Sequence, residues 1–379
     1  MSRLFGDVCD SVSDPYLRRA CRLAERGRGT TSPNPVVGCV LVRDGRVVGE
    51  GWHERAGGPH AEAVALASAG DAARGSTAYV TLEPCAHVGR TPSCASALIE
   101  AGVGRAVIGT SDPHTLARGG AEMLSHAGVE VEFADDPAPF NELITEWLHF
   151  ASTGTPFVRV KVALSLDGHS TLVPGSPSRI SGREASALTM RLRSEADAVM
   201  VGVATALSDD PALTVRGDDG SAAARQPRRV LLGRASQPPA SLRMLHDGAG
   251  VVTLLAPEGV PTEPMLARLV DTRSYALSDG LAGALNVLGG SGVVSLLVEA
   301  GPRLLTALYD GALIDELVLV HGGGMAGTSA PDLYLGADGA TGSLAKPLHV
   351  VDAGRCGADA VTVWRPDEEG TYRAGTDRS

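Results

Sequence analysis

The sequence is poor in aromatic residues and in positive charge, and both shortages argue against a polyanionic partner. Only 4% of the 379 residues are Phe, Trp or Tyr, whereas proteins that bind single-stranded nucleic acid usually stack bases on aromatic side chains. Lys and Arg number 33 against 44 Asp and Glu, which gives a net charge of -11. A bound anion therefore needs locally placed basic side chains or helix N-termini, and we expect no nucleic-acid partner.

The sequence also lacks long apolar runs and a dense set of cysteines. No stretch approaches the roughly 20 apolar residues of a membrane-spanning helix, and residues 1–14 carry acidic side chains without a signal-peptide core. These features predict a cytoplasmic protein without a membrane partner. Six cysteines are too few for a disulfide scaffold. Four of them, Cys9, Cys21, Cys39 and Cys356, need no role beyond packing or surface exposure.

The length and the order of the patterns predict two α/β domains. A hydrophobic content of 44% and 20% charged residues are typical of a globular chain, and 379 residues exceed one typical domain. An acidic segment with two prolines at residues 134–139 and the Thr-Gly-Thr-Pro run at 153–156 favour a boundary near residue 150. We expect domains over 1–150 and 151–379, with a frayed tail from about residue 367.

Strand and helix patterns alternate in both halves, which indicates layered α/β structure. The first half predicts helices that begin at Pro15, at His60 and near residue 141, and others over 95–101 and 120–127. Its strands are expected over 36–42, 46–48, 78–82, 105–109 and 129–133. The second half predicts strands over 157–164, 198–201, 229–232, 251–255, 293–299 and 316–320, helices over 183–194 and 303–309, and a closing hairpin of 348–351 with 360–364.

One imidazole and two thiols give the strongest chemical signal. His60 begins the run His-Ala-Glu, and Cys85 is followed nine positions later by Cys94. Three such ligands suit Zn²⁺ and leave a fourth position for water, which the metal makes acidic. Glu62, two residues beyond His60, is placed to move a proton from that water to a leaving amine. We expect His60 and Cys85 each to open a helix, whose N-terminal dipole favours thiolate.

This pattern is the signature of zinc nucleobase deaminases, His-x-Glu with Pro-Cys and a later Cys. The usual form separates the cysteines by two residues, whereas eight intervene here, residues 86–93. The alternatives are a structural zinc site or a core histidine beside two unrelated thiols. A structural site normally has four protein ligands, and no fourth candidate lies at a suitable spacing, so the catalytic interpretation is preferred.

The long insert carries a family resemblance. The segment TLEPCAHVGRTPSC at residues 81–94 resembles the deaminase half of the bifunctional riboflavin-biosynthesis deaminase–reductases, and PNPVVG at 33–38 fits the same family. The run at 53–62, with His53, Ala56, Gly57 and His60-Ala61-Glu62, fits it as well. The resemblance implies a cytidine-deaminase-like three-layer domain.

By the same resemblance, Asn34 and His53 hold the pyrimidine, while His87 and Arg90 hold the ribose phosphate. An Asn offers a donor and an acceptor to a pyrimidine edge, and Arg suits a phosphate. Turn chemistry between two prolines is the alternative for Asn34, and a solvated loop charge is the alternative for Arg90. The family's Asp-Pro-Asn-Pro segment reads Asp-Pro-His-Thr at 112–115, so His114 is not assigned.

The second half lacks the dinucleotide fingerprint Gly-x-Gly-x-x-Gly. The glycine-rich run at 289–292 precedes a strand and is read as a turn. A better phosphate site is the segment 298–302, which ends a strand and opens a helix with free N–H groups at Gly301, Arg303 and Leu304.

Several segments of this half resemble the reductase half of the same family. They are KVALSLDG at 161–168, Leu-Arg at 192–193, VGVATALSDDPALTVR at 201–216, RQPRRV at 225–230 and VEAGP at 298–302. The resemblance runs over nearly the whole chain in the family's domain order. It implies a dihydrofolate-reductase-like α/β domain that uses NADPH.

The resemblance also assigns site residues in this half. Lys161, Asp209 and Glu299 would line the reacting centre, and Arg193 and Arg216 would grip the substrate phosphate with Leu213 alongside. The cofactor would be held by Ala163, Thr205, Asp209, Gly301, Pro302, Arg303 and Leu304. Taken one at a time, these residues have plainer interpretations, such as a turn cap for Asp209 or an exposed helix charge for Arg193.

Three segments depart from the family pattern. Where the family has Trp, the chain has Arg179, and the Val-Leu-Asp after Arg-Gln-Pro is replaced by a run ending at Arg234. Residues 322–327 read GGGMAG in place of the family's Ala-Pro-Lys stretch. Arg179 and Arg234 are candidates for the cofactor's 2′-phosphate.

Together these features predict a bifunctional riboflavin-pathway enzyme that binds Zn²⁺ and NADPH and acts on a phosphorylated pyrimidine. The expected reactions are hydrolysis of the 2-amino group of 2,5-diamino-6-ribosylamino-4(3H)-pyrimidinone 5′-phosphate and reduction of the product to 5-amino-6-ribitylamino-uracil 5′-phosphate. One alternative is a deaminase with a degenerate second half, and another is a regulatory nucleotide-binding protein. Deaminases of this type are usually assemblies, so a homo-oligomer is expected.

Overall fold

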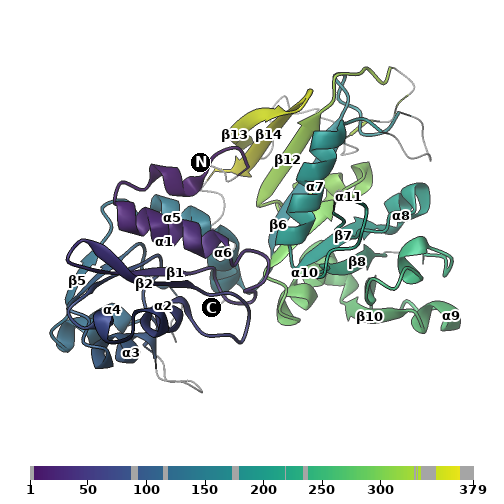
Figure 1. Ribbon diagram of the computed structural model, residues 1–379. Coiled ribbons are helices and arrows are strands. Elements are labelled where there is room, and N and C mark those ends of the chain that lie inside the picture. Colours follow the sequence, from purple (N-terminus) through teal and green to yellow (C-terminus); the bar gives the residue numbers. More distant parts are fainter. Residues whose placement is uncertain are drawn as a thin grey trace. The chain divides into compact units, whose positions relative to one another are not determined.

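The structure, a computed structural model, separates into two compact units, residues 1–154 and 155–379 (Figure 1). None of the helices in the described part of the chain has the length and apolarity that a membrane crossing requires. The tail expected from about residue 367 lies outside the described residues after Asp367. The structure describes residues 4–86, 93–113, 118–172, 179–217, 219–233, 238–327, 330, 332–333 and 347–367.

The first unit is a five-stranded sheet between two layers of helices. Its strand order is β2-β1-β3-β4-β5; β1 is antiparallel to both neighbours, and the last three strands run parallel. One apolar layer joins the sheet to α2, α3 and α4, and others join it to α1 and α5. Figure 1 shows these two groups of helices on opposite faces of the sheet. The bounds are α1 Pro15–Glu25, β1 Gly38–Arg43, β2 Arg46–Trp52, α2 Ala61–Ala69, β3 Thr77–Val80, α3 Cys94–Glu100, β4 Arg105–Ile108, α4 Gly120–His126, β5 Glu130–Phe133, α5 Ala138–Leu143 and α6 Thr145–Thr153.

Two glycines of β2 set the position of α2. A Cβ atom on Gly51 would lie 2.6 Å from the Val64 Cβ and 2.7 Å from the Ala61 carbonyl oxygen. A Cβ atom on Gly49 would lie 2.3 Å from the Ala65 carbonyl oxygen. Since no side chain fits in this space, the helix packs directly on the strand backbone. This contact fixes the start of α2, where His60 and Glu62 lie.

Two sequence interpretations of this unit are wrong. Cys85 opens no helix: it lies in the segment after β3, and Cys94 is the residue that begins the next helix, α3. The single helix expected near residue 141 is two helices, α5 and α6, which are interrupted at Ile144. The φ of Ile144 is -118°, so the backbone leaves the helical region there.

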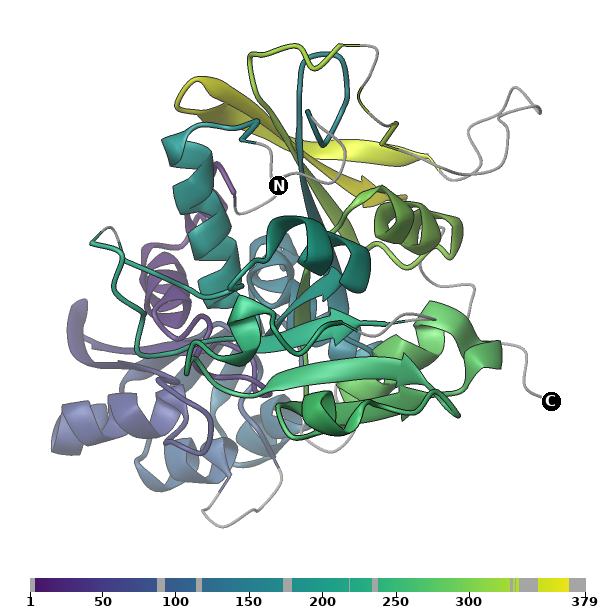
Figure 2. The same cartoon turned by 90° about the vertical axis from the view of Figure 1, so that its right-hand side faces the viewer.

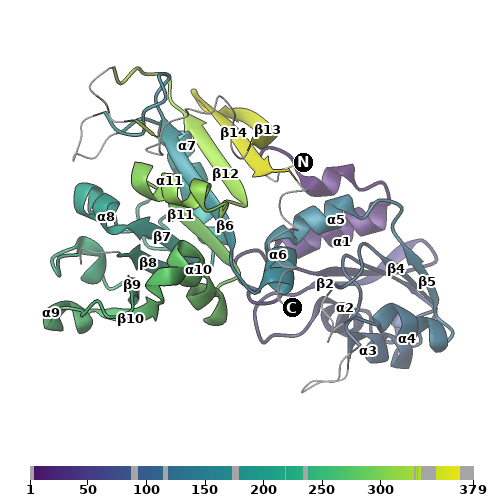
Figure 3. The ribbon, with the colours of Figure 1, turned by 180° about the vertical axis from the view of Figure 1, so that it is seen from behind.

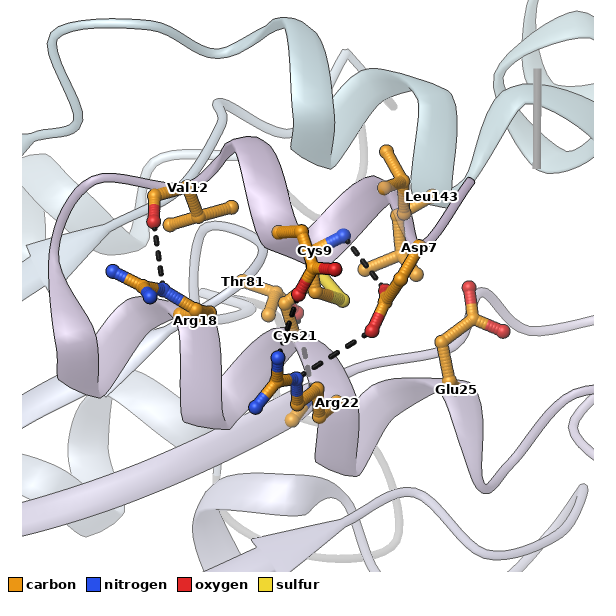
Figure 4. Close-up of a disulfide and its surroundings, with 12 residues drawn as sticks. Asp7, Cys9, Val12, Arg18, Cys21, Arg22, Glu25, Thr81 and Leu143 are labelled. Atoms are coloured by element: carbon orange, nitrogen blue, oxygen red, sulfur yellow. Dashed lines mark hydrogen bonds and ion pairs between the residues drawn. A yellow bond between two sulfur atoms is a disulfide. The ribbon is translucent and has the colours of Figure 1, made fainter. Parts of the chain in front are cut away.

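The plain role expected for Cys9 and Cys21 is also wrong, because they form a disulfide (Figure 4). The bond joins the short 3₁₀ helix η1, Val8–Ser11, to α1. Both cysteines are fully buried, and ion pairs from Arg22 to Asp7 and Asp10 reinforce the same contact. Composition argued only against a disulfide scaffold; the pairing depends on how η1 folds back onto α1.

We expect this disulfide to be present in purified protein and to contribute to stability. Alkylation of unfolded, unreduced, metal-free protein should modify the four free cysteines, and prior reduction should expose all six. The double variant C9S/C21S should lose up to about 3 kcal/mol of unfolding free energy, because a short closed loop restricts the unfolded chain. Urea denaturation measures this loss. The control variant is C356S, because Cys356 is half-exposed, whereas Cys39 is buried and its replacement would itself change stability. Six alkylated thiols without reduction would contradict the pairing.

The second unit is built on one nine-stranded sheet in the order β10-β9-β8-β7-β11-β6-β12-β14-β13. The strands from β10 to β12 run parallel, whereas β14 is antiparallel to β12 and β13 to β14. In Figure 2 the yellow β13–β14 hairpin and the green β10 lie at opposite edges of this sheet, and Figure 3 shows the same order from behind. An apolar cluster packs α10 and α11 on one face of its central strands.

The bounds in this unit agree closely with the predicted strands, with one omission. The edge strand β10 was not predicted, because Val270–Tyr275 reads Val-Asp-Thr-Arg-Ser-Tyr and is largely exposed, without the alternation of a half-buried strand. The bounds are β6 Phe157–Leu164, α7 Arg183–Glu195, β7 Ala198–Gly202, α8 Val203–Asp209, β8 Arg228–Leu232, β9 Val252–Pro257, α9 Pro264–Ala267, β10 Val270–Tyr275, α10 Gly280–Gly290, β11 Ser295–Glu299, α11 Pro302–Asp310, β12 Glu316–His321, β13 Leu348–Cys356 and β14 Asp359–Pro366.

Candidate active sites

The fold brings His60, Cys85 and Cys94 together in the first unit. One donor atom from each lies within 4.8 Å of the others. The His60 Nδ1 is 3.2 Å from the Cys94 Sγ and 3.8 Å from the Cys85 Sγ. His60 is the N-cap residue of α2 and Cys94 begins α3, so two helix starts and the segment after β3 meet at this point. A cation at this position would be reached by all three side chains.

The donor set fits zinc. Its hydrogen bond with Cys94 and the proximity of His60 lower the pKa of the Cys85 thiol to about 4, and the same pairing raises the pKa of Cys94. The Cys94 backbone N–H also donates to the Cys85 Sγ at 3.3 Å, which stabilises a thiolate. Two sulfurs and one imidazole are typical of catalytic zinc with an open fourth position. Within the described residues, no other group of three such ligands lies close together.

Glu62 lies beside this cluster and is buried. Its side chain is 3% exposed, and this burial raises the pKa of its carboxyl group. The carboxyl group interacts with both His60 and Cys94. A carboxyl group with a raised pKa next to a metal centre is suited to take up and release a proton near neutral pH. It is held on the first turn of α2 by the close packing of that helix on β2.

Asn34 and His53 lie together close to the cluster. The His53 Nδ1 is 2.9 Å from the Pro59 carbonyl oxygen, so Nδ1 carries the proton and donates it. The other ring nitrogen, Nε2, then accepts from the Asn34 side-chain amide at 3.3 Å. Burial lowers the pKa of His53 and favours this neutral form. The His53 ring meets the His60 ring edge-on, with centroids 5.5 Å apart. His53 is thus placed to orient Asn34.

Glu83 is a site residue that the sequence interpretation missed. Its carboxylate accepts backbone N–H groups of Asp112 at 3.1 Å and of Gly119 and Ala121 at 3.0 Å. These bonds fasten the start of α4 to the segment that carries Cys85. The available signal was an acidic residue directly before Pro84-Cys85 that follows a buried strand. His87, Arg90 and His114 lie outside the described residues.

The second unit holds a cavity of about 1040 Å³ at the carboxyl ends of its parallel strands. In open parallel sheets, ligands bind at this edge. Most of the residues expected to bind the cofactor or to react line this cavity: Lys161, Ala163, Thr205, Asp209, Glu299, Gly301, Pro302, Arg303 and Leu304. Arg234 lies outside the described residues, and Arg179 is described but exposed and not part of the lining.

Lys161 and Glu299 are neighbours at the base of the cavity. They are paired in register on the adjacent parallel strands β6 and β11. Burial lowers the pKa of Lys161, the Glu299 carboxylate opposes this change, and the Arg193 charge adds to it. Burial would raise the pKa of Glu299, but Arg193 and Lys161 hold it below its ordinary value. The half-buried carboxylate is thus kept charged between two cations.

Arg193 is engaged with protein groups. Its Nε and Nη2 atoms bind the two Glu299 oxygens at 2.5 and 2.8 Å, and its Nη1 donates to the Thr214 carbonyl at 2.9 Å. Arg193 is 7% exposed. A bidentate pair of this kind fixes the carboxylate in orientation. The grip of Arg193 on a substrate phosphate stays a prediction, and in the structure this residue orients Glu299.

The loop after α8 carries the other expected substrate contacts. Leu213 is fully buried and has a φ of +55°, a conformation that side-chain-bearing residues rarely adopt. Arg216 is exposed and bridges to Ala222 outside the cavity lining. The buried Arg229 holds this loop, since its Nη1 donates to the Ala212 carbonyl at 3.2 Å and to Asp247. Arg216 is therefore not part of the cavity lining, and its contact with a substrate phosphate stays a prediction, while Asp209 lines the cavity.

The start of α11 fits the phosphates of a dinucleotide. Gly301 is its N-cap residue, and a Cβ atom there would lie 2.7 Å from the Thr205 Oγ1, so a side chain at this position would displace Thr205. The expectation of three free N–H groups is wrong in one place, because the Leu304 N–H donates to the Gly301 carbonyl at 3.1 Å. Together with the size of the cavity, this cradle suits a cofactor such as NADPH.

Two parts of the chain match known families. Residues 11–110 match the cytidine and deoxycytidylate deaminase zinc-binding region, and residues 156–354 match the RibD C-terminal domain. These matches and the two sheets confirm the predicted fold class, an α/β deaminase domain followed by an α/β reductase domain.

Whole-chain relatives cover most of the sequence. The riboflavin biosynthesis protein RibD of Escherichia coli is 38% identical over 328 residues, which is 84% of this chain and 89% of that protein. The structure of Acinetobacter baumannii RibD, form 1, is 35% identical with a TM-score of 0.84 and covers 93% of this chain and 98% of that chain. A diaminohydroxyphosphoribosylaminopyrimidine deaminase/5-amino-6-(5-phosphoribosylamino)uracil reductase from Thermotoga maritima is 31% identical with a TM-score of 0.81, and covers 93% and 97%.

Proposed function

The chain belongs to the RibD family of bifunctional deaminase–reductases of riboflavin biosynthesis, and we propose that residues 1–150 carry the deaminase and residues 151–379 the reductase. The enzyme acts on a small phosphorylated substrate and uses zinc in the first activity and NADPH in the second. The observation that carries the proposal is the meeting of His60, Cys85 and Cys94 beside the buried carboxyl group of Glu62.

The proposed substrates follow from the activities named for the Thermotoga maritima relative. The first reaction hydrolyses 2,5-diamino-6-ribosylamino-4(3H)-pyrimidinone 5′-phosphate at its 2-amino group and releases ammonia. The second opens the ribosyl ring of the product by reduction and yields 5-amino-6-ribitylamino-uracil 5′-phosphate. The Lys161–Glu299 pair and the set of candidate metal ligands around His60 support separate sites for these two reactions.

In the deaminase, His60, Cys85 and Cys94 would hold zinc, which when bound makes a water molecule acidic enough to attack the pyrimidine. Glu62 takes a proton from that water and delivers it to the amino group, which leaves as ammonia while the carbon keeps the water oxygen. The Asn34 amide, oriented by His53, offers a donor and an acceptor to the pyrimidine edge. Glu83 keeps the Cys85 segment in place during this exchange.

In the reductase, the cradle at Gly301 and Thr205 would hold NADPH, which when bound supplies a hydride to C1′ of the sugar. Opening of the ring leaves its oxygen in need of a proton. Lys161, half-buried and in register with Glu299, is placed to donate that proton from its ammonium group. Glu299 keeps Lys161 oriented because Arg193 fixes the carboxylate in turn. Asp209 borders the same cavity and is assigned to substrate and cofactor positioning.

We also propose a homo-oligomeric, cytoplasmic enzyme with no nucleic-acid partner. The net charge of -11 and the 4% aromatic content support a small-molecule substrate over a nucleic-acid strand. A disulfide such as Cys9–Cys21 is uncommon in the cytoplasm, and mass spectrometry of protein alkylated in the cell tests whether the bond forms there.

One paired assay distinguishes the proposed function from its alternatives. With the diamino substrate and NADPH present, we expect ammonia release and a following decrease in absorbance at the NADPH band, in equal amounts. Ammonia without NADPH oxidation would leave a deaminase with a degenerate second half, which the departures at 179 and 322–327 favour. If neither ammonia nor oxidised NADPH is formed, the result would point to a regulatory nucleotide-binding protein. Chelation of zinc should stop both signals, and addition of the deaminated intermediate should restore only NADPH oxidation.

A further inference from the structure

A tight turn after β6 precedes a serine that lines the cofactor cavity. The Ser165 N–H donates to the His169 carbonyl at 2.9 Å, and the His169 N–H donates to the Ser165 Oγ at 3.1 Å. Gly168, with a φ of +84°, closes the turn. These reciprocal bonds fix the direction in which the chain leaves the turn at Ser170.

A second contact holds this turn to the neighbouring loop after β12. The Asp167 carboxylate accepts the Ser165 hydroxyl at 2.6 Å and the N–H groups of Ala326 at 2.9 Å and Gly327 at 2.7 Å. The Leu166 N–H donates to the Gly324 carbonyl at 2.8 Å. The GGGMAG segment, which departs from the family pattern in sequence, therefore anchors the turn through its backbone. Ser170 is held on a rigid support.

The Ser170 hydroxyl is buried and has no hydrogen-bond partner within the described part of the chain. Ser170 lines the cavity that Lys161 and Gly301 also line. Among the described residues, the other buried side-chain polar atoms that lack a hydrogen bond belong to Ser76, Arg105 and Arg229, and these residues do not line the cavity. Buried polar groups are paired in most proteins, so an orphaned hydroxyl at a cavity wall calls for a partner from a ligand.

The position of Ser170 selects one half of the cofactor. The cavity extends from Tyr275, on the edge strand β10, past Gly301 to Ser170, which follows β6. With the phosphates at Gly301, the hydride-bearing ring must lie near Lys161 on β6. The adenosine half then extends toward β10, four strands from β11 in the sheet. The nicotinamide half lies on the side of Ser170.

We propose that the Ser170 hydroxyl hydrogen-bonds the carboxamide of the NADPH nicotinamide ring and so fixes the ring over the reacting centre. A hydroxyl both donates and accepts, and a carboxamide offers one group of each kind. This inference rests on the proposed reductase function. The deaminase requires nothing of Ser170, so ammonia release serves as an internal control for the first unit, and binding of a ligand without the nicotinamide ring serves as the control for folding of the second.

The test compares NADPH with 2′-phosphoadenosine 5′-diphosphoribose, which lacks the nicotinamide ring. In fluorescence or calorimetric titrations of the full-length protein, S170A should bind NADPH about five- to tenfold more weakly, since one hydrogen bond is lost. Its affinity for the ring-less analogue should equal that of the unchanged protein. S170T, which keeps the hydroxyl, should largely restore NADPH affinity, and S186A, at an exposed serine of α7, should change neither affinity.

Each other outcome overturns the inference. Equal weakening toward both ligands would mean that Ser170 shapes the cavity without touching the ring. Unchanged NADPH affinity with a raised KM for the pyrimidine would assign the hydroxyl to the substrate. If the unchanged protein binds no NADPH, the proposed reductase function itself fails, and the Ser170 role fails with it.

Discussion

The variant Glu62→Gln should release ammonia at least about 10³-fold more slowly than the unchanged enzyme and should still contain zinc. General acid–base catalysis typically contributes 10²- to 10⁴-fold, and Glu62 serves both the attacking water and the leaving amine. Glutamine is nearly isosteric and can still hydrogen-bond near Cys94, but it cannot carry the proton. Coupled detection of ammonia gives the rate, and metal analysis of dialysed protein gives the zinc content.

Controls separate the proton shuttle from the metal site. Glu54→Gln, at an exposed position eight residues earlier, should keep the full rate. His60→Ala should lose both zinc and activity, because two sulfurs alone leave the site incomplete. NADPH oxidation with the deaminated intermediate should be normal in Glu62→Gln. A deamination rate within tenfold of the unchanged enzyme would exclude Glu62 from the proton transfer.

The variant Lys161→Met should lower NADPH oxidation about 10²- to 10⁴-fold while leaving ammonia release intact. Methionine fills the space of the lysine stem and removes the ammonium, so the opening sugar ring loses its proton donor and Glu299 loses one of its two cations. Lys161 is one of only two lysines in the sequence, against 31 arginines. A chain that otherwise uses arginine keeps at this position a cation that can release its proton.

The pH dependence of reduction provides a second readout for Lys161. Burial lowers the pKa of this ammonium below the ordinary lysine value of about 10.4. As pH rises, the proton is lost earlier, so the reductase rate should fall on an alkaline limb centred below that value. Lys161→Arg should remove the limb, since a guanidinium stays protonated. If Lys161→Met retains the rate and the limb, another group donates the proton; if it also loses ammonia release, the two halves are not independent.

The sequence alone was sufficient to predict the metal ligands, because these residues lie in short segments with a recognisable spacing. His60 and Glu62 are two residues apart, and Cys85 and Cys94 are nine positions apart, so residue type and spacing predict which side chains converge. The same holds for the start of α11, where a strand, a glycine and a proline follow in immediate succession. Hydrophobic periodicity fixed most strands of both sheets, since each strand buries its own residues.

Tertiary structure decided the contacts that join distant parts of the chain. Arg193 and Glu299 are 106 positions apart and Asp167 and Ala326 are 159 apart, and only the order of the parallel strands brings them together. The sequence could not show that Arg193 pairs with Glu299, and its contact with a substrate phosphate stays a prediction. The Cys9–Cys21 bond depends on the return of η1 onto α1, and the unpaired hydroxyl of Ser170 depends on the walls of the cavity. The spacing of residues in short segments thus predicts which side chains can bind a metal. Which distant side chains pair, and which polar groups are buried, is decided by how the whole chain packs.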